Sequence, residues 1–421
     1  MADGADFDVV IVGAGAAGIA ACRRLAAARL RVIALEARHR LGGRAWTVPT
    51  AIDKPVDLGC EWLHSADINP WSGIAGALGF ALDKTPPDWT SRIAIHDGEA
   101  ANEDWQRARD AFEEAYERAA RLSYDQPASA LLPPGGRWNK LFDAISTWAN
   151  GAELDKVSVK DRQNYNNTGL NWRCYDGYGA LINAYAEGLP IRRETVVERV
   201  DHSGRHIRIV TDRGELTANA VIVTLSTNLL AAEAIRFTPA LPRIVDAAAG
   251  LPCGVANKLF LALDGPTPAE SYLHLIGRTD RTETGNYQLR PHGWPMISCY
   301  FGGMLSVRLE KAGPAAMAAF AIDELAGIFG NDIRSRLHPL ASSAWGTDPF
   351  ARGSYSCALP GHVDNRTVLA TPVDDRLFFV GEACSRDQFG TAHAAFATAI
   401  AAADKIVQTT APAALPIAAA P

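Results

Sequence analysis

The sequence predicts an α/β fold, in which a parallel β-sheet with flanking helices is joined to a second, α+β region. Three observations support this prediction. The chain has 421 residues, which is enough for two to three domains. Its first forty-four residues read as strand, glycine-rich turn, helix and strand, the order of a βαβ unit. Short apolar strands return after residue 190 and near residue 377, so distant parts of the chain are expected to complete one sheet.

The N-terminal unit begins with an apolar run at residues 8–12, which is typical of a strand buried on both faces. The run ends at Gly13-Ala14-Gly15-Ala16-Ala17-Gly18, and a helical stretch over 19–28 and a second strand over 31–35 follow. Gly13 permits a tight turn, Gly15 lets a pyrophosphate approach the backbone, and Gly18 lets the helix pack closely on the strand. Together these features indicate a Rossmann-like dinucleotide site.

Charged residues after the second strand refine this interpretation. Glu36 stands 18 residues beyond the third glycine, where a carboxylate can accept hydrogen bonds from ribose hydroxyls. Arg38, His39 and Arg40 suggest a 2′-phosphate, but Glu36 would repel that group. Arg44, at the end of Leu41-Gly42-Gly43-Arg44, can reach the pyrophosphate as a fixed cation.

The composition argues against several functional classes. The 41 Lys and Arg against 47 Asp and Glu give a net charge of −6, whereas a nucleic-acid-binding face needs a positive excess. Seven scattered cysteines without a CxxC pair are typical of reduced thiols in the cytoplasm, and no HExxH pattern indicates a metal. No signal peptide and no run of 18 strongly apolar residues is visible, so we expect a cytoplasmic protein without a membrane span.

The run Glu36-Ala37-Arg38 followed by Leu41-Gly42-Gly43-Arg44 resembles the flavin-containing amine oxidases. The segment Asp57-Leu58-Gly59-Cys60-Glu61-Trp62-Leu63-His64 is similar to that family's next segment, in a form nearer to polyamine oxidases than to monoamine oxidases. The resemblance implies an FAD cofactor. The residues it places against FAD are Gly13, Gly15, Ala16, Ala17, Gly18, Glu36, Ala37, Arg38, Gly43, Arg44, Leu58, Gly59, Cys60, Glu61, Trp62, Val197, Trp345, Gly381, Glu382, Thr391 and Ala392.

The rest of the chain is expected to form two interleaved domains. The resemblance assigns 1–80, 188–236 and 345–410 to a discontinuous FAD-binding domain with an added β-meander, and 81–187 with 237–344 to a substrate domain. Residues 411–421 read as a flexible tail. The other predicted elements are strands at 93–96 (closing a hairpin at Asp97-Gly98), 191–200, 206–211, 220–224, 258–263 and 296–301, and helices at 105–122, 181–189 and 314–329.

Lys258 stands at the start of an apolar strand, and by itself this position favours an edge-strand lysine that reaches water. The resemblance matches Lys258 to the family's lysine, which holds a water against flavin N5. It also places Trp345 beside the isoalloxazine ring and Tyr355 at one wall of the family's aromatic cage. Monoamine oxidases have a tyrosine where this chain has Thr391, so the second wall is missing or is supplied by Phe389, Trp62 or Tyr300.

Two further acids and a histidine complete the candidate site. An apolar strand at 376–383 delivers Glu382, which in the family bonds the ribityl chain, and a helix from Thr391 to about 407 points its positive end toward reduced flavin. His393 reads as a packed helix residue. His64 and Glu61 are the substrate-side candidates, since His64 matches a polar or acidic group of polyamine oxidases. Ser354 stands where monoamine oxidases attach flavin through cysteine, so non-covalent FAD is expected, with Cys357 nearby.

The resemblance predicts an oxidase of primary or secondary amines, which passes hydride from the α-carbon to flavin N5. The imine is hydrolysed to an aldehyde, and O2 is reduced to hydrogen peroxide. The alternatives are a flavin desaturase or porphyrinogen oxidase, a non-enzymatic FAD-binding scaffold, and an L-amino-acid oxidase. The last would need an arginine clamp, for which Arg92, Arg173 and Arg290 are available. The sequence leaves a homodimer open.

Overall fold

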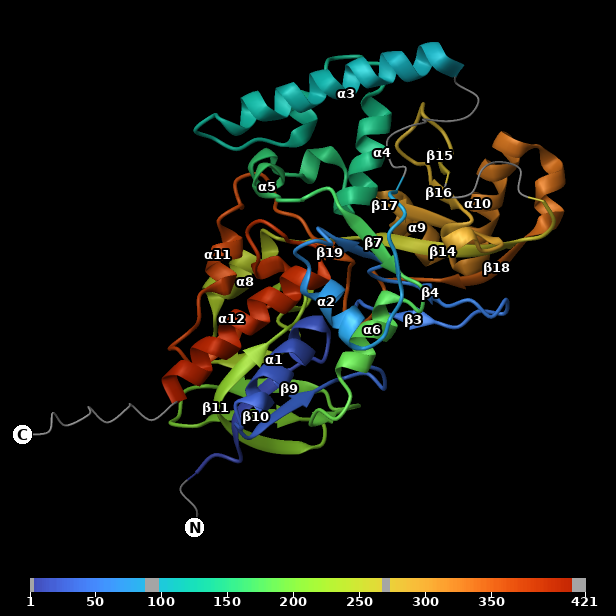
Figure 1. Cartoon of the computed structure of the whole chain (residues 1–421). Coiled ribbons are helices and arrows are strands. Elements are labelled where there is room, and N and C mark those ends of the chain that lie inside the picture. The colour runs from blue at the N-terminus through green and yellow to red at the C-terminus, as the bar shows by residue number, and fades with distance from the viewer. Residues whose placement is uncertain (1–3, 88–97, 267–272, 411–421) are drawn as a thin grey trace, which may run out of the picture.

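The N-terminal βαβ unit is part of an eight-stranded sheet in the computed structural model (Figure 1), which describes residues 4–87, 98–266 and 273–410. Strand β1 (Phe7–Val12) leads through helix α1 (Ala16–Ala27) to strand β2 (Val32–Leu35). β1 pairs in parallel with β2 on one side and with β11 (Gly214–Val223) on the other. The predicted α/β fold class is therefore confirmed, and the glycine turn lies at the carboxyl end of β1.

Distant segments extend this sheet on both sides. β8 (Ile191–Arg192) pairs with β2, and β20 (Leu377–Phe379) pairs with the end of β11. On the far side, β9 (Val197–Asp201) and β10 (Ile207–Thr211) join β11 as an antiparallel meander, and β12 (Arg236–Thr238) lies next to β9. The strands thus come from three separate parts of the chain, residues 7–35, 191–238 and 377–379.

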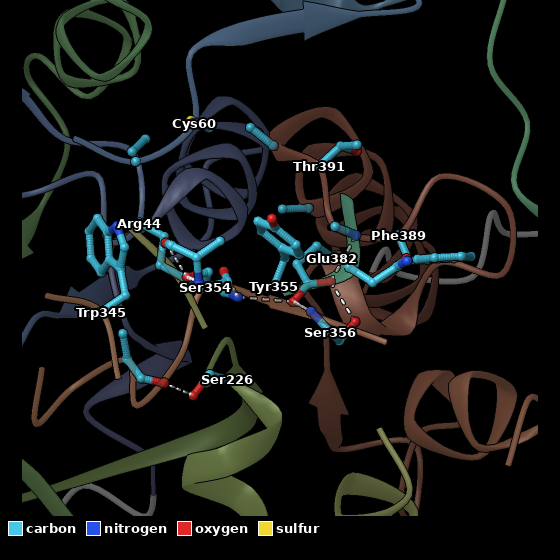
Figure 2. Close-up of a pocket in the computed structure, with 18 of the residues that line it drawn as sticks. Arg44, Cys60, Ser226, Trp345, Ser354, Tyr355, Ser356, Glu382, Phe389 and Thr391 are labelled. Carbon is cyan, nitrogen blue, oxygen red and sulfur yellow. Dashed lines mark hydrogen bonds and ion pairs between the residues drawn. The ribbon is translucent and has the colours of Figure 1, made fainter. Parts of the chain in front are cut away.

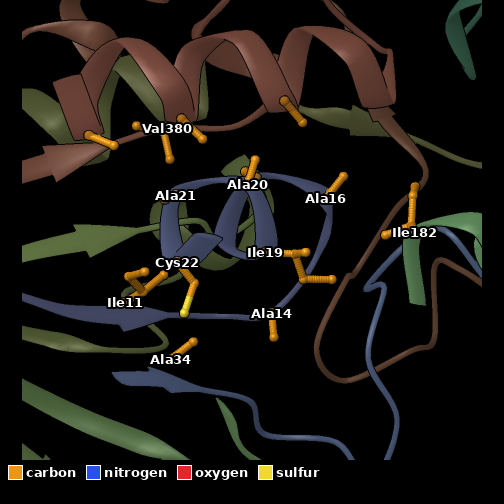
Figure 3. Packing of buried hydrophobic residues seen from close by; sticks show 14 of the residues in the cluster. Ile11, Ala14, Ala16, Ile19, Ala20, Ala21, Cys22, Ala34, Ile182 and Val380 are labelled. Carbon is orange, nitrogen blue, oxygen red and sulfur yellow. The ribbon is translucent and has the colours of Figure 1, made fainter. Parts of the chain in front are cut away.

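Helix α1 is enclosed between this sheet and helix α12 (Ala392–Thr410), as Figure 3 shows. Its buried residues include Ala20 and Ala21, whose small side chains let the two helices approach closely. Gly18 is required at the other contact, because a Cβ there would lie 1.9 Å from the Gly13 carbonyl oxygen. The sequence rule for the third glycine of the turn therefore holds in this chain.

A second, five-stranded antiparallel sheet lies beside the first. Its order is β15 (His274–Ile276), β16 (Asn286–Leu289), β17 (Met296–Gly302), β14 (Ala256–Leu263) and β18 (Leu337–Ser342). Leu259, Leu261, Tyr287 and Phe301 face the helices α9 (Gly303–Ala312) and α10 (Pro314–Phe329) in an apolar core. Because side chains alternate along a strand, the opposite face carries the residues between them, and the part of this face that lines the cavity is mostly polar. Its members are Lys258, His274, Asn286, Gln288, Ser298 and Tyr300.

Helices from the middle of the chain cover the space above this polar face (Figure 1). The long α3 (Gly98–Ala120) packs on α4 (Asn139–Asn150) and α5 (Val159–Asn164) through a cluster that contains Trp105, Phe112 and Phe142. The remaining elements are short: β3 (Thr47–Val48), β4 (Val56–Asp57), β5 (Trp62–His64), α2 (Pro70–Ala77), β6 (Leu82–Asp83), β7 (Asn171–Cys174), α6 (Tyr178–Tyr185), α7 (Thr227–Ala231), α8 (Pro242–Ala249), β13 (Cys253–Gly254), β19 (Tyr355–Ser356) and α11 (Asn365–Ala370).

Several predicted boundaries are wrong. The strand expected over 220–224 begins earlier, at Gly214, and three other differences have a local cause. The strand expected over 191–200 divides into β8 and β9, because Glu194 adopts a positive φ of 50° and the chain turns there to bond the Glu36–Arg38 backbone. The strand expected over 376–383 ends at Phe379, since Gly381 has a φ of 139° and Glu382 begins a short 3-10 helix. The helix expected over 181–189 is α6, which ends at Tyr185.

The hairpin predicted around residues 93–98 lies for the most part outside the described residues, and Gly98 begins α3 instead. The predicted helices over 105–122 and 314–329 are confirmed as α3 and α10. All seven cysteines are free. Among the described residues, no helix is long and apolar enough to cross a bilayer, and no cluster of three candidate metal ligands is present.

A buried ion pair joins α11 to α5. The fully buried Arg366 donates to both oxygens of Asp161, at 2.7 and 2.8 Å, and to Ser356 Oγ at 2.9 Å. Replacing Arg366 with methionine leaves the Asp161 carboxylate buried without its partner, so we expect a loss of about 3–5 kcal/mol in the free energy of unfolding. The half-exposed pair Arg24–Asp404 is the matched control.

Urea denaturation of Arg366→Met and Arg24→Met measures the difference. The Arg24 variant should lose at most about 1 kcal/mol, because water screens its ion pair. Equal losses in the two variants would contradict the prediction that the buried Arg366–Asp161 pair stabilises the fold more than the half-exposed pair does.

Candidate active site

A single cavity of about 1350 Å³ extends from the glycine turn after β1 to the polar face of the five-stranded sheet. It exceeds the size of an ordinary small-molecule pocket, which is about 300–1,000 Å³. The described residues that the sequence singled out for the cofactor line this cavity, with the exception of Gly18, whose role is to pack α1 on β1. The cavity therefore has room for a dinucleotide and a small substrate.

The first half of the cavity is built by the ends of β1 and β2. Helix α1 begins at Ala16, so the backbone N–H groups of its first turn lack partners within the helix and face the cavity. Glu36 is 4% exposed, and its carboxylate accepts hydrogen bonds from the N–H groups of Ala14 at 2.8 Å and Arg38 at 2.9 Å. These bonds fix the carboxylate at the end of β2, where a ribose of a dinucleotide would lie.

The turn at Gly42-Gly43 forms the opposite side of this phosphate region. Gly15 and Gly42 pair across a parallel bridge, and a Cβ on Gly43 would lie 3.2 Å from the Gly15 Cα. Gly42 and Gly43 adopt positive φ values of 89° and 59°. The two bare backbone turns and the helix N-terminus together fit a pyrophosphate, which is the group that all flavin and nicotinamide dinucleotides share.

Arg44 and Glu382 meet in the centre of the cavity (Figure 2). Arg44 Nη1 lies 3.0 Å from Glu382 Oε1 and donates to the Ser354 carbonyl at 2.8 Å. Glu382 also accepts from Ser356 Oγ at 2.7 Å and from the Gly390 N–H at 2.9 Å. Burial alone would raise the pKa of Glu382, but Arg44 and these hydrogen bonds outweigh it and lower the pKa. Glu382 is therefore an anion fixed at the start of the segment that leads to α12.

Lys258 lies in the middle of its sheet, since β14 pairs with β17 on one side and β18 on the other. The alternative of an edge-strand lysine that reaches water is therefore wrong. The Lys258 Nζ donates to Glu61 Oε2 at 2.7 Å and to the Asp57 carbonyl at 3.1 Å. Burial would lower the pKa of Lys258, but Glu61 raises it above the ordinary value, so the lysine is a permanent cation in the cavity.

Glu61 joins Lys258 to a second buried cation. Its Oε1 lies 3.4 Å from Arg173 Nη1, and Arg173 in turn contacts Asp83 and the Trp62 ring. Burial would raise the pKa of Glu61, but the charges of Lys258 and Arg173 lower it to about 2. No sequence pattern indicates this pairing, because Glu61, Arg173 and Lys258 lie on β5, β7 and β14 or beside them.

Two tyrosine hydroxyls meet near Lys258. Tyr300 on β17 and Tyr355 on β19 are joined by a hydrogen bond of 2.9 Å between their hydroxyl groups, and Tyr355 donates to the Trp148 carbonyl. Burial raises the pKa of both phenols, so both stay neutral. Phe389, Trp62 and Thr391 line the same cavity, and thus each aromatic residue named as a candidate for the second cage wall lies on it.

His64 lines the cavity within electrostatic reach of Glu61 and Lys258. Its Nδ1 lies 2.7 Å from Asn171 Oδ1, while Asn171 Nδ2 donates to the Gly169 carbonyl at 2.9 Å. Since the amide oxygen faces the ring, Nδ1 carries the proton and Nε2 is the basic nitrogen. Burial lowers the pKa of His64 below its ordinary value, so the ring is neutral at neutral pH.

The outer part of the cavity contains residues that the sequence analysis missed. The sequence analysis predicts α3 only as a helix and gives it no part in the site, yet Trp105, Arg109 and Phe112 line the cavity together with Trp148 of α4. The polar face of the second sheet was also missed, although the alternation of Asn286 and Gln288 with Tyr287 and Leu289 predicts a strand with one polar side. His393 is buried and, as predicted, belongs to the packing of α12 rather than to the lining of the cavity.

A dinucleotide turn, a buried lysine beside paired tyrosines and one continuous cavity fit a dinucleotide-dependent oxidoreductase. Comparison with known sequences agrees: the profile of the family described as flavin containing amine oxidoreductase matches residues 16–167 and 131–407. This chain belongs to that family. Membership implies a flavin cofactor, an amine substrate and oxygen as the acceptor.

Individual relatives within this family have names that refer to different substrates. The chain is 31% identical to Polyamine oxidase 3 of Oryza sativa subsp. japonica and 29% identical to Polyamine oxidase 4 of the same plant, in each case over 94% of this chain and 88% of the relative. It is 28% identical to Lysine-specific histone demethylase 1 homolog 2 of rice, over 95% of this chain and 57% of the relative. The names of these relatives refer to different substrates, polyamines in two cases and histone lysine in the third, so the comparisons show the family of this chain and not its substrate.

Proposed function

We propose that the protein is an FAD-dependent oxidase of primary or secondary amines, either polyamine-like amines or monoamines. The observation that carries this proposal is the Lys258 cation beside the Tyr300–Tyr355 pair, in a cavity that continues into the dinucleotide turn. The division into an FAD domain and a substrate domain is part of the proposal. It is supported by the separate segments that supply the two large sheets.

In this proposal, the half of the cavity next to the glycine turn binds FAD. Glu36 would accept from a ribose of FAD, the α1 N-terminus and Arg44 would bind the pyrophosphate, and Glu382 would bond the ribityl chain. Trp345, whose Nε1 donates to the Leu58 carbonyl at 2.9 Å, would lie beside the isoalloxazine. When bound, FAD would supply the hydride acceptor for the amine α-carbon and the route by which the two electrons reach O2, giving hydrogen peroxide.

The residues of the chain prepare the amine and the water. Tyr355, Tyr300 and the neighbouring aromatic side chains exclude bulk water from the amine, so that a neutral amine can lie in a dry slot. Lys258 holds and polarises the water that hydrolyses the imine to an aldehyde and ammonia or a shorter amine. Neutral His64 accepts the proton that a substrate ammonium must lose before its α-carbon can give up hydride.

The state of His64 predicts the pH dependence of the reaction. As the pH falls through the pKa of His64, the ring gains a proton, can no longer accept one, and repels the substrate ammonium. We therefore expect kcat/KM to fall on the acid side, at a pH below the ordinary histidine value. His64→Asn should lower kcat/KM by about 10- to 100-fold and remove this inflection from the profile.

A second variant separates the proton-accepting role of His64 from a structural role. Asn171→Asp places a carboxylate against Nδ1, which raises the pKa of His64, so the acid limb should move to higher pH while the fold is kept. Profiles of kcat/KM against pH for the two variants make the test. An acid limb that stays in place in both would contradict the assignment.

Non-covalent FAD is supported by the sulfur positions. Ser354 lines the cavity and Cys357 does not, while burial raises the pKa of the Cys60 thiol, which does line it. Burial raises the pKa of the Cys357 thiol to about 12, so it carries almost no thiolate at neutral pH. Denaturation with acid should therefore release the yellow cofactor into solution.

The amino-acid oxidase alternative is less well supported. Arg173 is buried among Glu61, Asp83 and Gln288, and Arg290 donates to the Gly293 carbonyl, so neither offers a carboxylate clamp in the cavity. Arg92 lies outside the described residues. A desaturase or porphyrinogen oxidase would act on apolar substrates, for which the charged centre of Lys258, Glu61 and Arg173 is poorly suited.

Anaerobic mixing with a panel of amines tests the proposal. A substrate amine should bleach the flavin absorbance, and air should then restore it with formation of hydrogen peroxide. If no amine bleaches the flavin, the proposal is wrong. Bound flavin without any oxygen reactivity would favour the scaffold alternative, and bleaching by a polyene or a porphyrinogen would favour the desaturase-type alternative.

A further inference from the structure

The polar face of the five-stranded sheet holds an amide whose orientation is fixed. Gln288 on β16 is 5% exposed and lines the cavity, and its Oε1 accepts a hydrogen bond of 2.8 Å from Arg173 Nη1. An arginine can only donate, so the oxygen of the amide must face Arg173 and the NH2 group must face away from it. The two ends of this amide are therefore distinguished by chemistry.

Arg173 is itself held by several contacts, and these contacts also fix the orientation of Gln288. It is 1% exposed and is held by Glu61 and Asp83, each at 3.4 Å, while its guanidinium lies 4.5 Å from the centre of the Trp62 ring. A continuous set of contacts thus runs from Lys258 through Glu61 and Arg173 to Gln288.

The NH2 group of Gln288 has no acceptor. Among the described residues, Gln288 Nε2 is buried and makes no hydrogen bond. A buried donor without a partner loses its hydrogen bond to water and gains none in return, so proteins rarely retain one unless something else satisfies it. Because Gln288 lines the cavity, a molecule bound there can supply the missing acceptor.

A second donor in the same cavity is in the same state. Trp148 is 8% exposed and lines the cavity, and its Nε1–H has no acceptor in the described part of the chain. The Trp148 carbonyl accepts from Tyr355, which bonds Tyr300. Tyr300 and Ser298 lie on β17 next to Gln288, whose register partner is Ser298. The tyrosine pair therefore connects the helix that carries Trp148 to the strand beside Gln288.

The charges nearby favour a neutral acceptor. Lys258 and Arg173 are balanced by Glu61 and Asp83, so the network behind Gln288 carries no net charge. A carboxylate would gain little there and would approach Glu61. A hydroxyl or carbonyl oxygen gains a hydrogen bond without that repulsion.

We infer that Gln288 is a specificity-determining residue that donates its amide N–H to a neutral oxygen of the substrate. The preferred substrate then carries a hydroxyl or carbonyl oxygen in addition to its amine, with Trp148 as the second donor. This inference rests on the proposed amine oxidase function and adds the chemical class of the substrate to it.

Paired substrates test the inference. Linear amino alcohols of three to eight carbons are compared with alkylamines of the same length, and kcat/KM is measured for both series. At the length that brings the hydroxyl to Gln288, we expect wild-type protein to prefer the amino alcohol about tenfold, mainly through KM. Gln288→Glu keeps the oxygen that Arg173 needs but removes the N–H donors, so the preference should disappear or reverse.

Gln288→Leu provides a second variant without a charge, and the flavin absorbance and thermal unfolding of both variants report whether the site is intact. In each variant the quantity compared is the ratio of the two substrates, which a general loss of activity does not change. Equal kcat/KM for both series at every length, or a ratio unchanged by Gln288→Glu, would overturn the inference while leaving the amine oxidase proposal standing. If no amine of either series is oxidised or shifts the flavin spectrum, the proposed function fails, and the inference fails with it.

Discussion

Replacing Lys258 with methionine is expected to lower amine turnover by about 100- to 1000-fold while the protein still binds flavin. Methionine has nearly the same length and volume as lysine but carries no charge. The change therefore removes the cation that donates to Glu61 and to the Asp57 carbonyl. Gly15, Glu36 and the other dinucleotide contacts are left in place. Stopped-flow absorbance separates the rate of flavin reduction by amine from the rate of reoxidation by air.

The same substitution has a second, independent effect on the fold. The Glu61 carboxylate stays buried. Without Lys258 its pKa rises, because the charge of Lys258 no longer helps Arg173 to oppose the effect of burial. Losing one partner of a buried ion pair costs about 3–5 kcal/mol in the free energy of unfolding. The double variant Lys258→Met with Glu61→Gln removes both charges, and the new amide oxygen can still accept from Arg173.

Comparison of the two variants separates catalysis from stability. The double variant should recover most of the lost stability but none of the lost turnover. If turnover also recovers, the function of Lys258 is only to neutralise Glu61. If Lys258→Met reoxidises and turns over at the wild-type rate, the catalytic assignment is wrong. Urea denaturation and peroxide formation on the same preparations provide the two readouts.

The parts of the fold that the sequence predicts well are those determined by local chemistry. The glycine turn from Gly13 to Gly18 and the alanine-rich α10 follow from backbone sterics and helix propensity alone, and both are confirmed. The boundaries that were wrong depend on tertiary contacts. The chain leaves the strand at Glu194 because its backbone bonds the Glu36–Arg38 segment, a partner more than 150 residues away.

The residues of the candidate site fall into the same two groups, those in short sequence patterns and those that tertiary contacts bring together. Glu36, Arg44 and Lys258 belong to short patterns that the family resemblance identifies, and each lies on the cavity. Arg173 and Gln288 belong to no such pattern. Their importance comes from the convergence of β5, β7 and β16 on one spot, and one-dimensional spacing carries no information about that convergence. The alternation of polar and apolar residues in β16 predicts a polar face but not what lies opposite to it.

Gly15→Ala is expected to weaken flavin binding by about 100-fold, or about 2.7 kcal/mol, without unfolding the protein. Gly15 precedes α1 with a φ of −78°, which any residue can adopt, and an added Cβ would meet no atom closer than the Gly42 oxygen at 3.7 Å. The protein alone therefore tolerates alanine. The methyl group lies between the two glycine turns, where a pyrophosphate must come close to the backbone.

Gly18→Ala is the matched control, because the same methyl group has the opposite consequence at the last glycine of the turn. Its Cβ would lie 1.9 Å from the Gly13 oxygen, so α1 must move away from β1, and the flavin-free protein itself should lose stability. Flavin titration and thermal unfolding of the flavin-free proteins distinguish the two. An intact flavin affinity in Gly15→Ala would show that the dinucleotide does not lie on this turn. A flavin-free Gly15→Ala protein that unfolds as readily as Gly18→Ala would show instead that both glycines serve packing alone.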